Sequence, residues 1–151
     1  MAEVAQVQMV GLRALQRDLR KLTSDQGALN KAFAAAGQAA AEPVAATARA
    51  NVPQDTGRLA SSIRVRKMRS GAGVAMGSSS VRWAGWVEFG GTRRAPHRST
   101  RPYDPRGRYL FPAGLVLGST GATIYAEALT VALANVPWTN ESTNNPDSIH
   151  D

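Results

Sequence analysis

The sequence predicts an α+β protein in which an N-terminal short strand and long helices pack on a small antiparallel β-sheet, with a C-terminal helix. An alanine-rich stretch from Gln26 to Asn51 indicates a long helix, because alanine loses no rotamer freedom there. Ser62 to Arg69 alternates apolar and basic residues in the manner of a half-buried strand. Thr123 to Asn135 repeats apolar residues at a helical period and predicts the last helix.

Length and composition indicate one domain. The 151 residues can bury a hydrophobic core without disulfides or metals. We expect one α+β domain over residues 4–136, with an Arg/Pro-rich loop at 92–108, and then a flexible acidic tail at 137–151. The absence of cysteine excludes disulfides, cysteine-ligated zinc and thiol catalysis. His97 and His150 are the only imidazoles, so we expect neither a metal site nor a cofactor.

No part of the chain has the hydropathy of a membrane span. Apolar runs fall short of the roughly 20 residues that a spanning helix needs, and the N-terminus lacks the pattern of a secretory signal. We therefore expect no membrane partner, and action in the cytosol or in a particle assembled there.

The positive charge is concentrated in the middle of the chain. The sequence has 18 Lys and Arg against 11 Asp and Glu, a net charge of +7. From Arg58 to Arg108, Glu88 and Asp104 are the only acidic residues, whereas basic residues recur throughout. This distribution fits either a solvated surface or a face that lies near phosphate or an acidic protein partner.

The N-terminal third predicts a strand and two helices. Val4 to Val10 resembles a short strand that ends at Gly11. Leucines then recur at spacings of three and four, which predicts an amphipathic helix with one leucine stripe: Leu12, Leu15, Leu19 and Leu22. In the alanine-rich helix, Pro43 removes a backbone donor, and we expect a kink or a restart near Ala41 to Pro43.

The middle third predicts a hairpin and an aromatic segment. The strand at Ser62 to Arg69 is followed by turn residues, and Val74 to Gly77 can return as its antiparallel partner. In Val81 to Thr92, the spacing of Trp83, Trp86, Val87 and Gly90 favours a short helix ended by glycines, with a strand as the alternative. We interpret these aromatic residues as core, and Glu88 among them as the partner of a nearby arginine.

The Arg/Pro-rich loop has neither a helical nor a strand period. A loop of this length in a compact domain is usually functional or disordered, and we expect an arm that orders against a partner. Its six arginines are the predicted residues for contact with that partner: Arg93, Arg94, Arg98, Arg101, Arg106 and Arg108. Beyond the loop, Tyr109 to Pro112 predicts a short strand.

Asp55-Thr56-Gly57 matches the catalytic triplet of retroviral-type aspartic proteases. In those enzymes the triplet ends an apolar strand and works with a second aspartate, whereas here Pro53-Gln54 precede it and Arg58-Leu59 follow. The physical alternative is that Asp55 or Thr56 caps a helical turn from Gly57 to Ser62. The sequence also lacks a phosphate-binding loop and a Ser/His pair in plausible context, so we expect no catalytic residue and no enzyme.

The order of these features resembles the Hong Kong 97-type neck and tail-completion family of long-tailed bacteriophages, related to the minor tail protein Z of phage lambda. The opening Gly-Leu-x-x-Leu is matched by residues 11–15. A Pro-x-Asp-Thr-Gly-x-Leu-x-x-Ser-Ile motif after the long helix is matched by Pro53, Asp55, Thr56, Gly57, Leu59, Ser62 and Ile63. A later aromatic segment ending in Val-Glu-Phe-Gly-Thr is matched by Trp86, Val87, Glu88, Phe89 and Gly90, with Gly91 inserted before Thr92. The extra glycine and the Arg/Pro-rich insertion depart from the family pattern.

The resemblance implies a non-catalytic virion protein at the head-to-tail joint. It implies a ring of identical subunits, with a hexamer favoured over a dodecamer, that meets neighbouring connector, tail-terminator or tail-tube proteins. Packaged double-stranded DNA in the lumen is a further expected contact. The alternative hypothesis is a basic nucleic-acid-binding protein that acts outside the virion.

Overall fold

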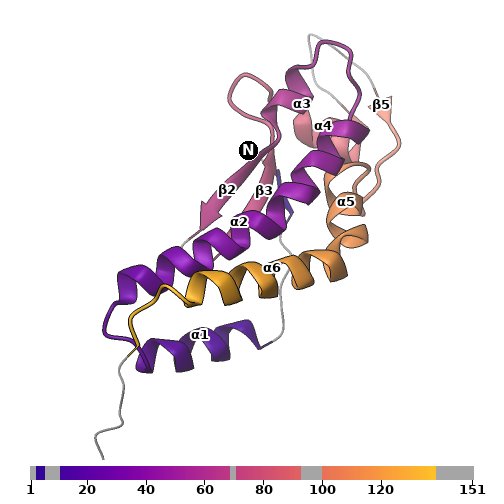
Figure 1. The fold of residues 1–151 in the computed structure, drawn as a ribbon. Coiled ribbons are helices and arrows are strands. Elements are labelled where there is room, and N and C mark those ends of the chain that lie inside the picture. Colours follow the sequence, from indigo (N-terminus) through magenta and orange to yellow (C-terminus); the bar gives the residue numbers. More distant parts are fainter. Residues whose placement is uncertain (1–2, 6–10, 69–70, 93–99, 139–151) are drawn as a thin grey trace, which may run out of the picture.

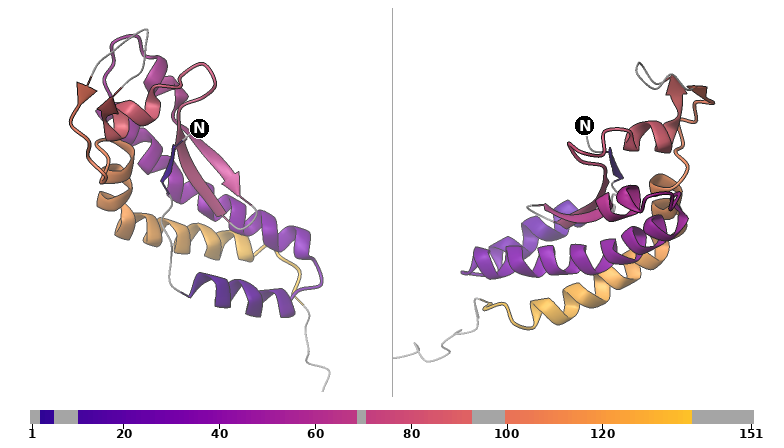
Figure 2. Two further views of the ribbon diagram at one scale, coloured as in Figure 1. Left: turned by 180° about the vertical axis from the view of Figure 1, so that it is seen from behind. Right: turned by 90° about the horizontal axis from the view of Figure 1, so that it is seen from above.

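The long helix α2 (Gln26–Asn51) lies at the centre of the fold. The computed structural model describes residues 3–5, 11–68, 71–92 and 100–138. The β-sheet lies on one side of α2 and helix α6 (Gly118–Leu133) on the other, so that sheet, α2 and α6 form successive layers (Figures 1 and 2). This arrangement confirms the predicted α+β class.

Helix α1 (Leu12–Lys21) is the predicted amphipathic helix, but its leucines do not all face the core. Leu12 and Leu19 pack against the hydrophobic cluster that α2 forms with α6. Leu15 is 45% exposed and Leu22 is 54% exposed. The buried position between them is taken by Gln16. The predicted leucine stripe is therefore only half correct, because the spacing 12, 16, 19 faces the core.

Helix α2 runs through Pro43 without a restart. Asp25 caps its start by accepting a hydrogen bond from the backbone N–H of Ala28 at 2.8 Å. Around the proline, Ala41, Val44 and Ala45 are buried in the core. The predicted restart is wrong, because packing on both sides of the helix offsets the backbone hydrogen bond that proline cannot donate. The alternative, a kink at Pro43, stays a prediction.

The main sheet has the strand order β1-β3-β2, and both pairings are antiparallel. The central strand β3 (Gly71–Met76) pairs with β2 (Arg64–Met68) as predicted, and on its other side with β1 (Glu3–Ala5). The predicted first strand, 4–10, is confirmed at its start only, since residues 6–10 lie outside the described residues.

The two faces of this sheet differ in chemistry. Val65 is paired with Val74, and both pack into the core that includes α2. Neighbouring residues of a strand point to opposite faces. Arg64 and Arg66 therefore lie on the outer face, opposite the small residues Ala75 and Gly73.

The chain ends in two helices joined at a 67° bend, α5 (Leu110–Val116) and α6. The predicted strand at Tyr109 to Pro112 is wrong, and the last helix begins at Gly118, five residues before its predicted start. Pro112 fits in α5 because it lies in the first turn, where a backbone N–H has no partner within the helix. In the described residues no single helix is long and apolar enough to cross a membrane, although α5 and α6 together pass that test as a bent pair.

The end of α6 is fixed against the α1–α2 connection. The Thr23 hydroxyl donates to the Pro137 carbonyl, and Thr23 and Trp138 form an isolated antiparallel bridge. The Trp138 indole N–H also donates to the carbonyl of Leu133 at 3.3 Å. The rest of the predicted acidic tail, residues 139–151, lies outside the described residues.

Gly37 sets the closest approach of α2 to the sheet. A Cβ at this position would lie 2.6 Å from the Ala72 nitrogen and 2.7 Å from the Gly71 carbonyl carbon. Gly37→Ala is expected to lower the free energy of unfolding by about 1–3 kcal/mol through overpacking, despite the better helix propensity of alanine. Urea unfolding followed by circular dichroism measures this change.

Gly114→Ala is the matched control, because a Cβ on this helical glycine would meet no atom within 4 Å. It should leave stability unchanged or raise it by up to about 1 kcal/mol. Equal effects of the two substitutions would contradict the close contact at Gly37.

Candidate assembly site at the meeting of the two motifs

We name the Pro-x-Asp-Thr-Gly-x-Leu-x-x-Ser-Ile segment, residues 53–63, the first motif. It begins where α2 ends. Val52 closes the helix with its N–H bonded to the Ala48 carbonyl, and its extended backbone directs the chain into Pro53. The side-chain amide of Gln54 then donates to the carbonyls of Arg49 and Val52, at 2.7 and 3.2 Å. These bonds satisfy carbonyls at the helix end that have no partner within the helix.

Helix α3 (Arg58–Ser62) starts at Gly57 and not at a capping side chain. Gly57 has a left-handed backbone with φ of 68°, and no side chain in the described structure caps the helix. Asp55 and Thr56 are exposed. The predicted cap by Asp55 or Thr56 is therefore wrong: the turn into α3 is made by the backbone of glycine, which adopts positive φ at little cost.

Ser62 ties the first motif to the sheet. Its hydroxyl donates to the Leu59 carbonyl at 2.6 Å and accepts from the Gly77 N–H at 3.0 Å. Leu59 and Ile63 on either side of it are buried in the core. The Leu-x-x-Ser-Ile part of the motif therefore serves packing and one buried hydrogen-bonded junction.

We name the aromatic segment that ends in Val-Glu-Phe-Gly, residues 86–90, the second motif. It lies in helix α4 (Ala84–Phe89) and the glycine that ends it, as predicted. Val87 is buried, whereas Trp83 and Trp86 are only partly buried and pack on the edge of the core. The Trp86 indole N–H donates to the Gly91 carbonyl at 2.9 Å. Phe89 packs against Phe111 of α5, with ring centroids 5.4 Å apart.

Glu88 is fully buried, and its carboxylate caps α5. The carboxylate oxygens accept the backbone N–H groups of Tyr109, Leu110 and Phe111 at 3.0 to 3.1 Å. A carboxylate is favoured at a helix N-terminus, where free N–H groups and the helix dipole both attract negative charge. Among the described residues no ion pair involves Glu88, so the expected arginine partner is not found there and the carboxylate is instead held by backbone N–H groups.

Two glycines let the backbone approach Glu88 and its helix. A Cβ on Gly107, which has φ of 73°, would collide with the Glu88 carboxylate. A Cβ on Gly90, with φ of 82°, would collide with the Pro102 carbonyl. Sequence reasoning identified Gly90 but missed Gly107, whose only signal was a glycine between two arginines.

The structure places two of the six loop arginines inside the fold. Arg101 donates to the Val87 carbonyl and to the Tyr109 hydroxyl, both at 3.1 Å. Arg108 donates to the carbonyls of Glu88 and Pro102. These guanidinium groups satisfy carbonyls around α4, so their contacts are structural.

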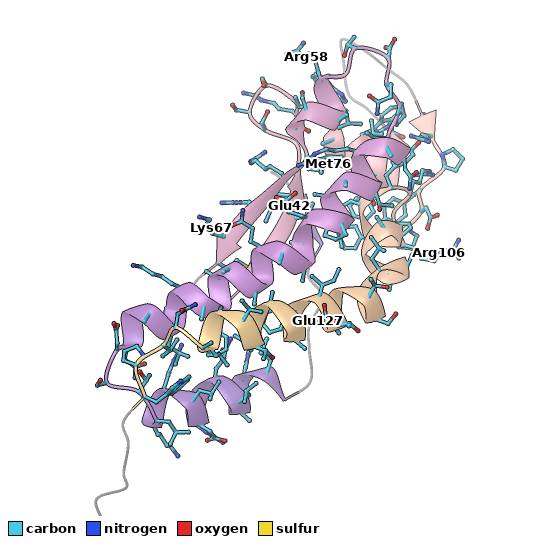
Figure 3. All side chains as sticks on the ribbon, in the orientation of Figure 1. Glu42, Arg58, Lys67, Met76, Arg106 and Glu127 are labelled. Carbon is cyan, nitrogen blue, oxygen red and sulfur yellow. The ribbon has the colours of Figure 1, made fainter. Side chains whose placement is uncertain are left out.

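Arg106 is the one described loop arginine that faces solvent (Figure 3). Its guanidinium pairs with the Asp104 carboxylate at 3.3 Å. A hydrogen bond from the Arg106 backbone N–H, together with the Arg106 side chain, holds the pKa of Asp104 below its usual value against partial desolvation. A lowered carboxyl pKa stabilises the fold above the unfolded-state pKa, and this contribution is lost as pH falls through the folded value. Arg93, Arg94 and Arg98 lie outside the described residues. In the sequence they fall between β4 (Gly91–Thr92) and β5 (Thr100–Arg101), which pair antiparallel.

The two motifs line one open hollow of about 410 Å³. Pro53, Asp55 and Thr56 contribute from the first motif, Trp86 from the second, and Trp83 from the start of α4. The Arg58 guanidinium lies over the Trp83 ring, 5.5 Å from its centroid. Partly buried indoles and an exposed cation suit contact with another protein chain.

Within the described residues, no three His, Cys, Asp or Glu side chains form a metal-binding group. His97 and His150 lie outside them. The structure thus brings the two motifs together with Arg101 and Arg108. The two carboxylates of the motifs have different environments, since Asp55 is exposed and Glu88 is buried.

The fold and this site define a small α+β protein whose two motifs meet in one structural unit. Residues 13–90, more than half of the chain, match the model of a family described as "Bacteriophage HK97-gp10, putative tail-component". The chain therefore belongs to this family of bacteriophage tail components, and the family predicted from the motifs is confirmed. The relation to protein Z of phage lambda stays a prediction. No curated protein and no solved structure matches the chain significantly.

The buried cap is tested by Glu88→Gln. The amide nitrogen of glutamine would face backbone N–H groups that need an acceptor, and we expect a loss of about 2–4 kcal/mol in the free energy of unfolding. Glu42→Gln, at an exposed position of α2, is the control and should change stability by less than about 0.5 kcal/mol. If thermal unfolding of the two variants coincides, Glu88 does not hold α5.

Substitutions of Asp55 and Gly57 distinguish a catalytic role of the first motif from a structural role. Asp55→Asn should change the free energy of unfolding by less than about 0.5 kcal/mol, because the side chain is exposed and does not cap α3. Gly57→Val should cost about 1–2 kcal/mol or more, since a β-branched residue must adopt φ of 68°. Thermal unfolding and particle assembly measure both; a silent Gly57→Val would remove the role given to this turn.

Proposed function

We propose that this chain is a structural subunit at the head–tail joint of a long-tailed bacteriophage. It completes the tail or neck as a homo-oligomeric ring around the DNA channel, with a hexamer favoured. The observation that carries this proposal is the family match over residues 13–90, which includes both motifs of the structural unit described above. In this role the chain belongs to the virion and assembles in the cytoplasm of the bacterial host.

We further propose that the chain is not an enzyme. The residues that first suggested catalysis have other environments: Asp55 is exposed beside a glycine turn, and the oxygens of Glu88 accept backbone N–H groups. Its partners are then neighbouring connector, tail-terminator or tail-tube proteins, and DNA in the lumen. The hollow between the motifs and the solvent-facing part of the Arg/Pro-rich loop are the surfaces that support such contacts.

Purified protein distinguishes this function from that of a nucleic-acid-binding protein outside the virion. Negative-stain images should show closed rings, and native mass spectrometry should give a single stoichiometry. A monodisperse monomer that binds duplex DNA with a steep salt dependence would overturn the proposal in favour of the alternative.

The loop arginines separate into two experimental groups. Changing Arg93, Arg94 and Arg98 to Ser should leave thermal unfolding near wild type and block particle assembly or DNA retention. Arg101→Ser should instead lower stability by about 1–3 kcal/mol, because the Val87 carbonyl loses a charged donor. Infectious particles of normal yield from the triple variant would show that this part of the loop is passive surface.

A further inference from the structure

The C-terminal helices carry an unusual outer surface. Between Tyr109 and Trp138 the sequence contains one charged residue, Glu127, although α6 exposes a full face to solvent. The exposed positions of α6 are small or uncharged apart from this glutamate: Ser119, Thr120, Thr123, Ala126, Thr130 and Val131. Depletion of charge on an exposed face is typical of the centre of a protein interface.

Large apolar side chains are also exposed on the two C-terminal helices. Leu115 is 79% exposed, Val116 is 75% exposed, and Val131 on α6 is 70% exposed. A single exposed apolar residue needs no explanation, but several beside a nearly uncharged helix indicate a binding surface. We name this surface, formed by the end of α5 and the exposed positions of α6, the helical face.

Two exposed cations lie on the sheet side of α2, away from α6 (Figure 3). Arg66 lies on the outer face of the sheet opposite Gly73, and the next residue, Lys67, points to the other face. β2 is an edge strand, so these two exposed cations flank its free edge from the two sides. In the described part of the chain, no ion pair involves either residue. We name Arg66, Lys67 and the free edge of β2 between them the strand face.

The layered fold separates the helical face from the strand face. Figure 3 shows Lys67 on the β2 side and Glu127 on the α6 side, with α2 running between them. A contact that joins two different faces of identical subunits is heterologous, and such contacts close into rings when the rotation between subunits permits it. An isologous contact centred on the helical face would instead bring two Glu127 carboxylates together, which is unfavourable.

We propose that the helical face of one copy binds the strand face of the next copy in the ring. This inference rests on the proposed function and deepens it by naming the two surfaces. Glu127 supplies the one charge of the helical face, and Arg66 and Lys67 supply its complement. The exposed apolar residues and threonines around Glu127 exclude water from that pair and strengthen it.

Two charge-reversal variants test the contact. The helix variant is Glu127→Lys, and the strand variant combines Arg66→Glu with Lys67→Glu. All three side chains are exposed, so both variants should fold with wild-type thermal unfolding. Each alone should need at least about tenfold more protein to assemble into rings, because every contact then opposes like charges. Asp18→Lys reverses an exposed charge on α1, away from both faces, and should assemble as wild type.

Mixing the two variants provides the decisive measurement. In a ring that alternates them, half of the contacts join the reversed charge of the helix variant to the reversed charges of the strand variant. The other half join the native glutamate of the strand variant to the native cations of the helix variant, so every contact again pairs opposite charges. Equal amounts should therefore restore rings that contain both variants at one to one by native mass spectrometry, and a hexamer permits this alternation.

The outcomes are distinct. Wild type without rings would overturn the proposed function, and this inference with it. Rings of wild type and of both single variants at the same concentration, or no rescue on mixing, would overturn this inference alone. A strand variant that still forms rings but no longer binds duplex DNA would also overturn it. So would binding of the helical face to lipid vesicles in place of a second copy of the chain.

Discussion

The position of the C-terminal half depends on the hydrogen bonds between the Glu88 carboxylate and the start of α5. A buried carboxylate is stable only where donors replace its water, and here the donors are three successive backbone N–H groups. Since the acceptor lies in α4 and the donors lie after the Arg/Pro-rich loop, the contact fixes where the chain re-enters the core beyond that loop. Helix α6 follows α5 directly, so its placement on α2 also depends on this contact.

Residues with a strong local period could be predicted from the sequence. The alanine-rich helix, the β2–β3 hairpin and α4 have periods that agree with the structure. The segment at Tyr109 could not be assigned, because Tyr-Leu-Phe-Pro favours a strand locally and becomes helical only when Glu88 accepts its N–H groups. Pro43 failed as a breaker for the same reason: distant contacts outweighed a local preference.

The candidate site was predictable as two motifs but not as one unit. From the sequence, Asp55 could be interpreted as a catalytic residue or as a helix cap. In the structure the turn is made by Gly57, two residues later, which has a left-handed backbone. The arginine-rich loop could only be treated as one block in the sequence. In the structure Arg101 and Arg108 donate to the carbonyls of Val87 and Glu88 in α4. These acceptors are distant in the sequence, so the residue type alone does not show which arginines reach them.

The small residues of α2 connect the fold to the proposed assembly. Gly37 lets β3 approach one side of the helix, and Ala36 and Ala40 meet the α6 side. These residues therefore set the distance between the two outer layers of the subunit. If those layers contact neighbouring copies, the thickness of α2 and its side chains also sets the distance between the two contact surfaces of each subunit. An alanine-rich helix then serves stability and ring geometry through the same property, its narrow and uniform cross-section.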